Sequence, residues 1–198
     1  MGLLIAELRP TQITVGMREV RDRQKRWRAQ DGERQAKFLR SNIIPVIRGP
    51  KGRFFVVDHH HLSLALHNEG VKSMLGTVFA DLSALGEDEF WVFLDIRGWV
   101  HPYDTAGRRC AYNAIPSRIT GLKDDPYRSL AGELRRACFG KATAPPFSEF
   151  LWADFLRRRI DRETVKDKFV KALKQALKLA KSHQAHHLPG SRAAQEPD

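Results

Sequence analysis

Four consecutive residues, Asp58-His59-His60-His61, place a carboxyl group beside three imidazoles. An imidazole exchanges a proton near neutral pH, and a neighbouring carboxylate can orient it, so the run has the composition of a general acid–base site. Successive helix positions point about 100° apart, so three consecutive histidines cannot all bind one metal ion from a regular helix. The run therefore favours proton transfer or anion binding over a three-histidine zinc site.

The run lies where an expected strand ends and an expected helix begins. Residues 53–58 (RFFVVD) have an apolar strand pattern, and residues 59–69 carry apolar side chains at helical spacing. The N–H groups at the start of a helix attract phosphate and other anions. We expect Asp58 to cap this helix and His60 and His61 to donate to an anion or exchange a proton there. In the alternative interpretation Asp58 only caps the helix and the histidines are surface residues.

Hydrophobic periodicity and turn residues predict the remaining elements. The expected strands cover residues 3–8, 43–49, 53–58 and 74–82, with a Gly-Pro-Lys-Gly turn between the second and third. The expected helices cover residues 18–40 with a break at Asp31-Gly32, residues 59–69, and most of the chain from Glu87 onward. These elements predict an α/β fold with a largely helical C-terminal half.

Two amphipathic patterns occur near the C-terminus. The first has its apolar stripe at Phe147, Phe150, Leu151, Phe155 and Leu156. The second predicts one helix over about 161–182 with lysines on one face and an apolar stripe at Val165, Phe169, Leu173, Ala176, Leu177 and Ala180. An isolated helix of this length is marginal in water, so this stripe must pack on the body or on a second copy. We expect a domain over 1–160, a basic amphipathic helix over 161–187 and a disordered tail over 188–198.

The net charge of +11 is distributed unevenly along the chain. Residues 1–50 hold 11 Lys or Arg against 5 Asp or Glu, and residues 157–181 hold 10 against 3. Basic segments of this kind are suited to nucleotide or nucleic-acid phosphate as partner. Exposed basic helices without a partner are the alternative.

Cysteine content and apolar runs bear on the compartment. Cys110 and Cys138 are the only cysteines, which argues against a disulfide framework. The N-terminus lacks the pattern of a signal peptide, and no apolar run approaches the roughly 18 residues of a membrane span. We expect a cytoplasmic protein without membrane contact, and the oligomeric state stays open.

Residues 4–82 resemble the ParB/sulfiredoxin superfamily in the order of their motifs. The motifs are ELRPTQ, SNIIPVIRGPKGRFFVVDHHHLSLAL and VFADL. Together with LKDDPYRSLAG and PFSEFLWADF, residues 4–160 resemble the branch described as ParB-like nucleases. The resemblance implies a small mixed sheet and a phosphate-handling site at the helix after Asp58. The superfamily contains nucleotide-gated DNA clamps, a reductase, serine kinases and nucleases.

The chain departs from the sequence patterns of these relatives, and the departures reduce the number of activities that it could have. The reductase pattern would need cysteine at His60, and the clamp pattern would need arginines at His61 and Leu62. The Asp-Gly-His-His-Arg pattern of the serine kinases is matched at Asp58, His60 and His61 but not at His59 or Leu62. Those kinases also carry a catalytic glutamate on the turn after the first strand.

The corresponding turn here carries Gln12, with Glu19 further along the chain. An amide cannot act as a base, which counts against the kinase role.

Further polar residues could complete a site. We assign Asp58, His60 and His61 to catalysis. The candidates for phosphate or substrate binding are His59, Gln12, His101, Asp104, Arg128 and Lys141. The adjacent carboxylates Asp124 and Asp125 could hold Mg²⁺ or Mn²⁺, although capping of the following helix is the favoured role. The cofactor is open between such a metal ion and a nucleotide.

These observations predict a phosphate-handling enzyme with its site at the start of the helix after Asp58. Phosphodiester cleavage ranks ahead of nucleotide-dependent phosphoryl transfer, because His60 or His61 can serve as base or acid with Asp58 orienting it. The alternative is a non-catalytic module that binds a nucleotide or DNA.

Overall fold

The structure of the protein is a computed structural model that describes residues 1–138 and 148–191. Its residues form two compact units, one of residues 1–15 and 19–124 and one of residues 16–18 and those from 125 onward. All strands of the described residues belong to the first unit, and the second is helical. The expected mixed α/β fold is thereby confirmed. Among the described residues, no helix combines the length and apolar character that crossing a membrane requires.

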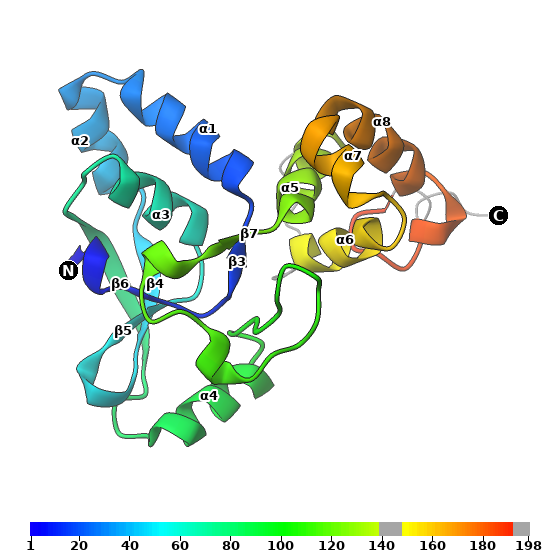
Figure 1. Cartoon of the computed structure of the whole chain (residues 1–198). Helices are drawn as coiled ribbons and strands as arrows, with labels where there is room; N and C mark the ends of the chain where they lie inside the picture. The colour runs from blue at the N-terminus through cyan, green and yellow to red at the C-terminus, as the bar shows by residue number, and fades with distance from the viewer. Residues whose placement is uncertain (139–147, 192–198) are drawn as a thin grey trace. The chain divides into compact units, whose positions relative to one another are not determined.

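A five-stranded mixed sheet organises the first unit (Figure 1). In order across the sheet, its strands are β1 (Gly2–Leu4), β6 (Ser73–Asp81), β4 (Ile44–Arg48), β5 (Phe54–Val56) and β2 (Arg9–Pro10). The β1–β6 and β4–β5 pairs are antiparallel, and the β4–β6 and β2–β5 pairs are parallel. A separate parallel pair joins β3 (Thr14–Val15) to β7 (Lys123–Asp124). The strand, turn, strand pattern expected over 43–58 is confirmed.

The strand expected over residues 3–8 is wrong in extent. Strand β1 ends at Leu4, a 3-10 turn covers Ile5–Glu7, and β2 starts at Arg9. Ile5 and Leu8 are both fully buried. Residues three apart point to opposite faces of a strand, so burying both in one core requires the chain to turn between them.

Helix α4 (Glu87–Ile96) covers one face of the sheet through aromatic packing. Ile47 and Phe55 are register partners on β4 and β5, and Phe55 packs on Phe90 of α4 with ring centroids 4.5 Å apart. Gly49 permits this approach, because a Cβ atom there would lie 2.7 Å from each of the two rings. The turn after β4 therefore depends on glycine for the packing of α4.

Three further helices precede β6 in the chain. They are α1 (Met17–Arg28), α2 (Gly32–Ser41) and α3 (His60–Asn68). Figure 1 shows them gathered on one side of the sheet and α4 on the other. The Asp31 carboxylate accepts a hydrogen bond from the Arg34 N–H (2.9 Å) and so starts α2, which confirms the expected break at Asp31-Gly32.

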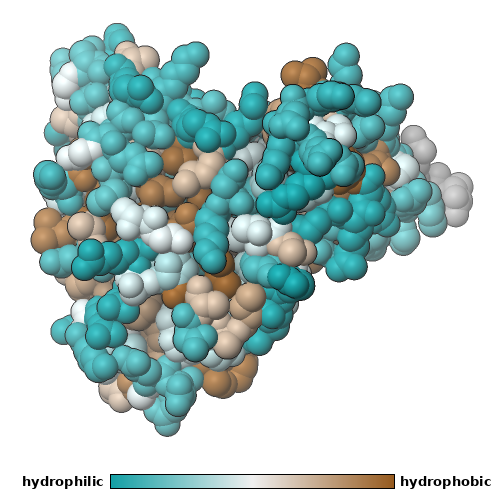
Figure 2. Space-filling view, in the orientation of Figure 1, coloured by the Kyte–Doolittle hydropathy of each residue, from teal (hydrophilic) through white to brown (hydrophobic). Residues whose placement is uncertain are grey.

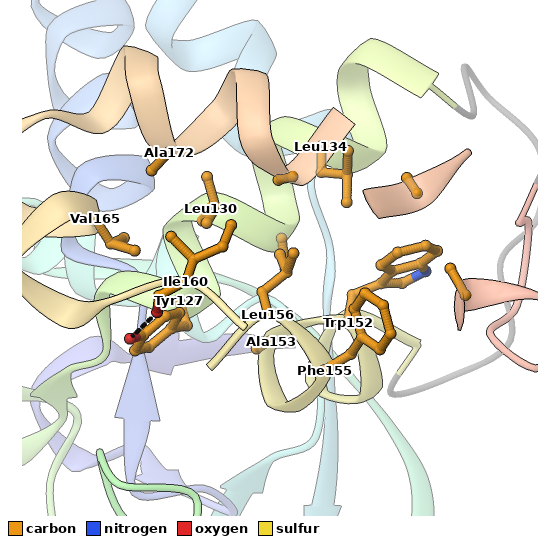
Figure 3. Packing of buried hydrophobic residues seen from close by; sticks show 14 of the residues in the cluster. Tyr127, Leu130, Leu134, Trp152, Ala153, Phe155, Leu156, Ile160, Val165 and Ala172 are labelled. Carbon is orange, nitrogen blue, oxygen red and sulfur yellow. Dashed lines mark hydrogen bonds between the residues drawn. The ribbon is translucent and has the colours of Figure 1, made fainter. Parts of the chain in front are cut away.

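In the described residues of the second unit, four α-helices surround an apolar core of their own. They are α5 (Pro126–Cys138), α6 (Ser148–Arg157), α7 (Arg162–Asp167) and α8 (Phe169–Ala180). Figure 3 shows Leu130 and Leu134 of α5 facing Trp152 and Leu156 of α6. The Tyr127 hydroxyl donates a hydrogen bond to the Ile160 carbonyl (2.8 Å) at the edge of this core.

The single helix expected over 161–182 is two helices. Lys168, with φ −128° and ψ 48°, separates α7 from α8. The bend allows Val165 before it and Ala172 after it to enter the same core. The expected apolar stripe packs on the helices of its own unit, with the alanines fully buried.

The stripe expected on α6 is confirmed at Phe155 and Leu156, which are buried, but it is wrong at Leu151. Leu151 is 52% exposed, whereas Trp152 is 3% exposed and donates through Nε1 to the Pro189 carbonyl (3.0 Å). Phe147 lies outside the described residues. The boundaries expected at 160 and 187 stay predictions, and of the expected tail the structure describes 188–191 only, where Leu188 and Ser191 are buried.

We predict that ending the chain after Ile160 unfolds the second unit. The truncation removes Val165, Ala172, Ala176 and Leu188 from the core and exposes apolar surface of α5 and α6 to water. Each Å² of apolar surface exposed in this way lowers the free energy of unfolding by about 25 cal/mol. Hydrogen exchange should then show loss of protection in α5 and α6. A chain ended after Ser191 is the control and should keep protection; persistence of protection in the shorter chain would contradict the prediction.

Candidate functional site

The turn before α3 has an unusual backbone. His59 adopts a left-handed conformation (φ 66°, ψ 23°), which favours glycine, and its N–H donates to the Asp58 carboxylate (2.6 Å). Glycine, which the kinase pattern carries at this position, adopts this conformation without steric cost. The expectation that Asp58 caps α3 is therefore wrong: the N-cap residue is His59, and the Asp58 carboxylate accepts a hydrogen bond in the turn before the helix. Asp58 itself is exposed.

His60 is held in the protein interior by the backbone of another segment. Its Nε2 accepts a hydrogen bond from the Thr11 N–H (3.1 Å), and His60 as a whole is only 4% exposed. The Thr11 hydroxyl donates to the Val56 carbonyl (2.8 Å), which anchors the same segment to the end of β5. A neutral imidazole that accepts at Nε2 carries its proton on Nδ1. His60 therefore positions the Thr11 segment against the start of α3.

His61 lies beside a buried carboxylate. Its Nε2 is 3.9 Å from Oε2 of Glu19 on α1, and the side chains are 11% and 8% exposed. The other oxygen, Oε1, accepts from Nη2 (2.7 Å) and Nε (3.0 Å) of Arg23 one helical turn later. Arg23 thus fixes the carboxylate that faces His61. This arrangement can stabilise a protonated imidazole, as an acid–base pair requires.

Glu19 and Arg23 are the contributions that sequence reasoning missed. In the sequence, Glu19 is only an acid that lies beyond the position of the kinase glutamate. A usable signal was present, since Glu and Arg at i and i+4 form an ion pair on one helix face. What the pattern could not indicate is that this face meets His61, 42 positions along the chain.

The Thr11-Gln12 segment also reaches the loop that contains His101. The His101 N–H donates to the Thr11 carbonyl (2.8 Å), and Gln12 and His101 form a parallel bridge. The structure thus brings His60 and His101 to the same peptide segment. The Gln12 side chain is buried and donates from Nε2 to the Thr14 carbonyl (2.7 Å), so its amide holds the local backbone.

Asp104 closes the loop after His101. Its Oδ1 accepts from the N–H groups of Ala106 (2.8 Å) and Arg108 (2.9 Å), and Oδ2 accepts from Nε of Arg108 (3.0 Å). Partial burial works to raise the pKa of this carboxyl, but the hydrogen bonds from Arg108 and Ala106 together hold the pKa below its ordinary value. Within the first unit, Asp104 is therefore a loop-forming residue as well as a phosphate-binding candidate.

Asp124 and Asp125 occupy different environments. Asp124 is an exposed residue of β7. Asp125 is buried, pairs with Arg157 through Oδ2, and caps α5 by accepting from the Tyr127 N–H at Oδ1 (3.1 Å). Burial raises the pKa of Asp125, while the charge of Arg157 acts in the opposite direction. Within residues 1–138 and 148–191, no group of three or more His, Cys, Asp or Glu side chains is placed to hold a metal ion.

Arg128 belongs to the second unit, where it is buried. Its Nη2 lies 3.8 Å from Oε2 of Glu149, and its guanidinium carbon lies 3.4 Å from the centre of the Phe150 ring. Glu149 also pairs with Arg135 (2.9 Å). Lys141 lies outside the described residues. The assignment of Arg128 and Lys141 to phosphate binding stays a prediction.

Comparison with known proteins shows the family to which the chain belongs. A family profile described as "Putative ParB-like nuclease" matches residues 1–158, and the chain belongs to this family. The crystal structure of protein Atu1540 from Agrobacterium tumefaciens is similar at 49% sequence identity with a TM-score of 0.88, over 96% of each chain. The comparison with curated proteins found no match. The resemblance noted from the sequence is therefore confirmed at the level of the family.

We predict that His60→Ala destabilises the protein by about 2–4 kcal/mol, because it leaves a cavity and an unsatisfied buried Thr11 N–H. His60→Gln should cost about half as much, because the glutamine side-chain oxygen can reach the position of Nε2. Urea unfolding of both variants measures the difference. Equal losses would show that the hydrogen bond to Thr11 contributes little.

We predict that Asp104→Asn lowers the melting temperature at pH 7 and that this loss becomes smaller as the pH falls below 3.8. The folded-state pKa of Asp104 is depressed, so its stabilisation is present above the ordinary value of 3.8 and is lost as the pH falls through the folded pKa. Melting curves of both proteins between pH 7 and 3 measure the gap. A gap that is constant over this range would contradict the assigned cause.

Proposed function

We propose that this protein is a phosphate-handling enzyme that cleaves phosphodiesters at the start of α3. The observation that carries the proposal is the buried pair of His61 and Glu19, with Arg23 holding the carboxylate. The family description supports the reaction class. Backbone N–H groups and the positive end of the helix dipole at the start of α3 favour a bound phosphate.

The proposed chemistry assigns proton transfer to His61. A water molecule attacks phosphorus as His61 takes its proton, a new P–O bond forms, and the bond to the leaving oxygen breaks. Glu19 stabilises the resulting imidazolium, and its low exposure strengthens that attraction. The leaving oxygen then receives a proton from the imidazolium or from solvent. The 3.9 Å separation is long for a hydrogen bond, and such contacts commonly tighten when substrate binds.

The remaining candidates take supporting roles in this proposal. His60 positions the Thr11 segment, since its Nε2 is already an acceptor. Asp58 holds the turn at His59. His59 and His101 are the proposed phosphate-contacting imidazoles. A divalent metal ion, if the reaction uses one, would arrive with the substrate phosphate, and Asp124 is the proposed carboxylate ligand.

The presence of an amide at Gln12, in place of a carboxylate, favours cleavage over nucleotide-dependent phosphoryl transfer. The kinases that resemble this chain use a glutamate as base on the equivalent turn. The Gln12 amide cannot take a proton, and it donates to the Thr14 carbonyl. A non-catalytic phosphate-binding module is the second candidate, and the structural hydrogen bond of His60 favours it.

The test measures turnover of bis(p-nitrophenyl) phosphate and of labelled DNA and RNA, with Mg²⁺, Mn²⁺ or EDTA. We predict that His61→Gln and Glu19→Gln each lower kcat by about 100-fold or more while KM changes little. His67→Gln makes the same chemical change near the end of the same helix and should leave kcat unchanged.

The outcomes separate the two candidates. Activity lost in His61→Gln and retained in His67→Gln supports cleavage by His61. An inactive wild-type protein whose melting temperature rises with nucleotide or phosphate would instead identify a binding module.

A further inference from the structure

The end of the described chain has an unusual charge composition. Residues 168–191 contain five lysines and no Asp or Glu. Four of the lysines lie on α8 or directly after it, and all four are exposed: Lys171, Lys174, Lys178 and Lys181. We call these four residues the lysine row.

The lysine row lies along one side of a helix whose orientation is fixed. Positions i, i+3, i+7 and i+10 fall within about 80° of one another around a helix and span about 15 Å along it. The opposite side of α8 is committed to the core of the second unit through Ala172, Ala176 and Ala180. Figure 2 shows a predominantly hydrophilic surface over the region where Figure 1 draws α7 and α8. The row is therefore a preordered line of ammonium groups facing solvent.

Three arginines of the same unit differ from these lysines in that they form ion pairs. Arg135, Arg136 and Arg157 pair with Glu149, Glu133 and Asp125 respectively. Within residues 1–138 and 148–191, no ion pair or hydrogen bond is observed to the side chain of any lysine in the row. These three arginines are thus neutralised within the unit, whereas the lysine row is a separate set of positive charges on its surface.

We propose that the lysine row binds the sugar-phosphate backbone of nucleic acid without reading its sequence. One strand of a duplex presents a phosphate about every 3.4 Å along the axis, so a 15 Å row can follow about four phosphates. Lysine acts as a point charge and needs no fixed geometry, which suits contacts to a repeating backbone. The row is distinct from the proposed reaction at His61, and neither depends on the other.

Two other polyanions are less well matched to this surface. A membrane-bound amphipathic helix inserts its apolar face among lipids, but the apolar face of α8 is buried in the protein core. An acidic protein partner normally adds apolar contacts at the centre of an interface. Beside the row, Val170 is the one large apolar side chain of α8 recorded as well exposed in the described residues.

The experiment uses the full chain and a fluorescein-labelled DNA duplex of 20 base pairs and mixed sequence. Fluorescence anisotropy gives the affinity between 50 and 300 mM KCl. Changing all four lysines to glutamine should weaken binding at least tenfold at 100 mM KCl and reduce the salt slope by about three to four, near 0.9 per phosphate contact. Changing all four to arginine should preserve both quantities.

The matched control removes the same charge elsewhere. Lys25, Arg26, Lys37 and Arg40 are exposed on α1 and α2, and changing them to glutamine should leave the slope close to that of the wild-type protein. An equal loss in the control would overturn the proposal, because net charge alone would then explain binding. Stronger competition by polyglutamate or by anionic phospholipid vesicles than by unlabelled duplex would also overturn it. Circular dichroism confirms that each variant keeps its helices.

Discussion

The peptide of Thr11 is the constraint on which the candidate site depends. Its N–H donates to His60, its carbonyl accepts from the His101 N–H, and its hydroxyl donates to the Val56 carbonyl. One residue therefore satisfies backbone or ring partners from the end of β5, the start of α3 and the loop after α4. A buried polar group left unpaired costs about 1–3 kcal/mol, so these bonds hold the three segments in register. The position of His61 relative to Glu19 depends on that register.

His60 and His61 are both buried, but they have different roles in the structure, whereas the sequence suggested one role for both. His60 accepts a hydrogen bond from the backbone and therefore shapes the turn. His61, the next residue, lies 100° further around the helix and meets a carboxylate held by Arg23. Adjacent residues of one type thus take different roles because a helix presents them to different neighbours. The same geometry points His60 and His61 in different directions, which disfavours a shared metal site for the histidine run.

Arginines and lysines described in the second unit also occupy different environments. Arg135, Arg136 and Arg157 pair with acids, which suits a planar guanidinium that forms two hydrogen bonds at once. The four lysines of the lysine row lie at the surface, where their strongly hydrated ammonium groups avoid the cost of desolvation. The basic segment recognised in the sequence is thus partly internal structure and partly an outward-facing surface. The fully buried alanines of α8 keep that surface turned outward.

Local signals in the sequence were sufficient for the α/β class, the hairpin of β4 and β5, the start of α3 near Asp58 and the family. Apolar periodicity and glycine act over a few residues, so they can be read without the fold. Only the tertiary structure decided that Thr11 bonds to His60 across 49 positions, that Glu19 faces His61, and that the C-terminal segment bends at Lys168 to complete a core. These contacts depend on which distant surfaces must be buried together. No local pattern carries that information.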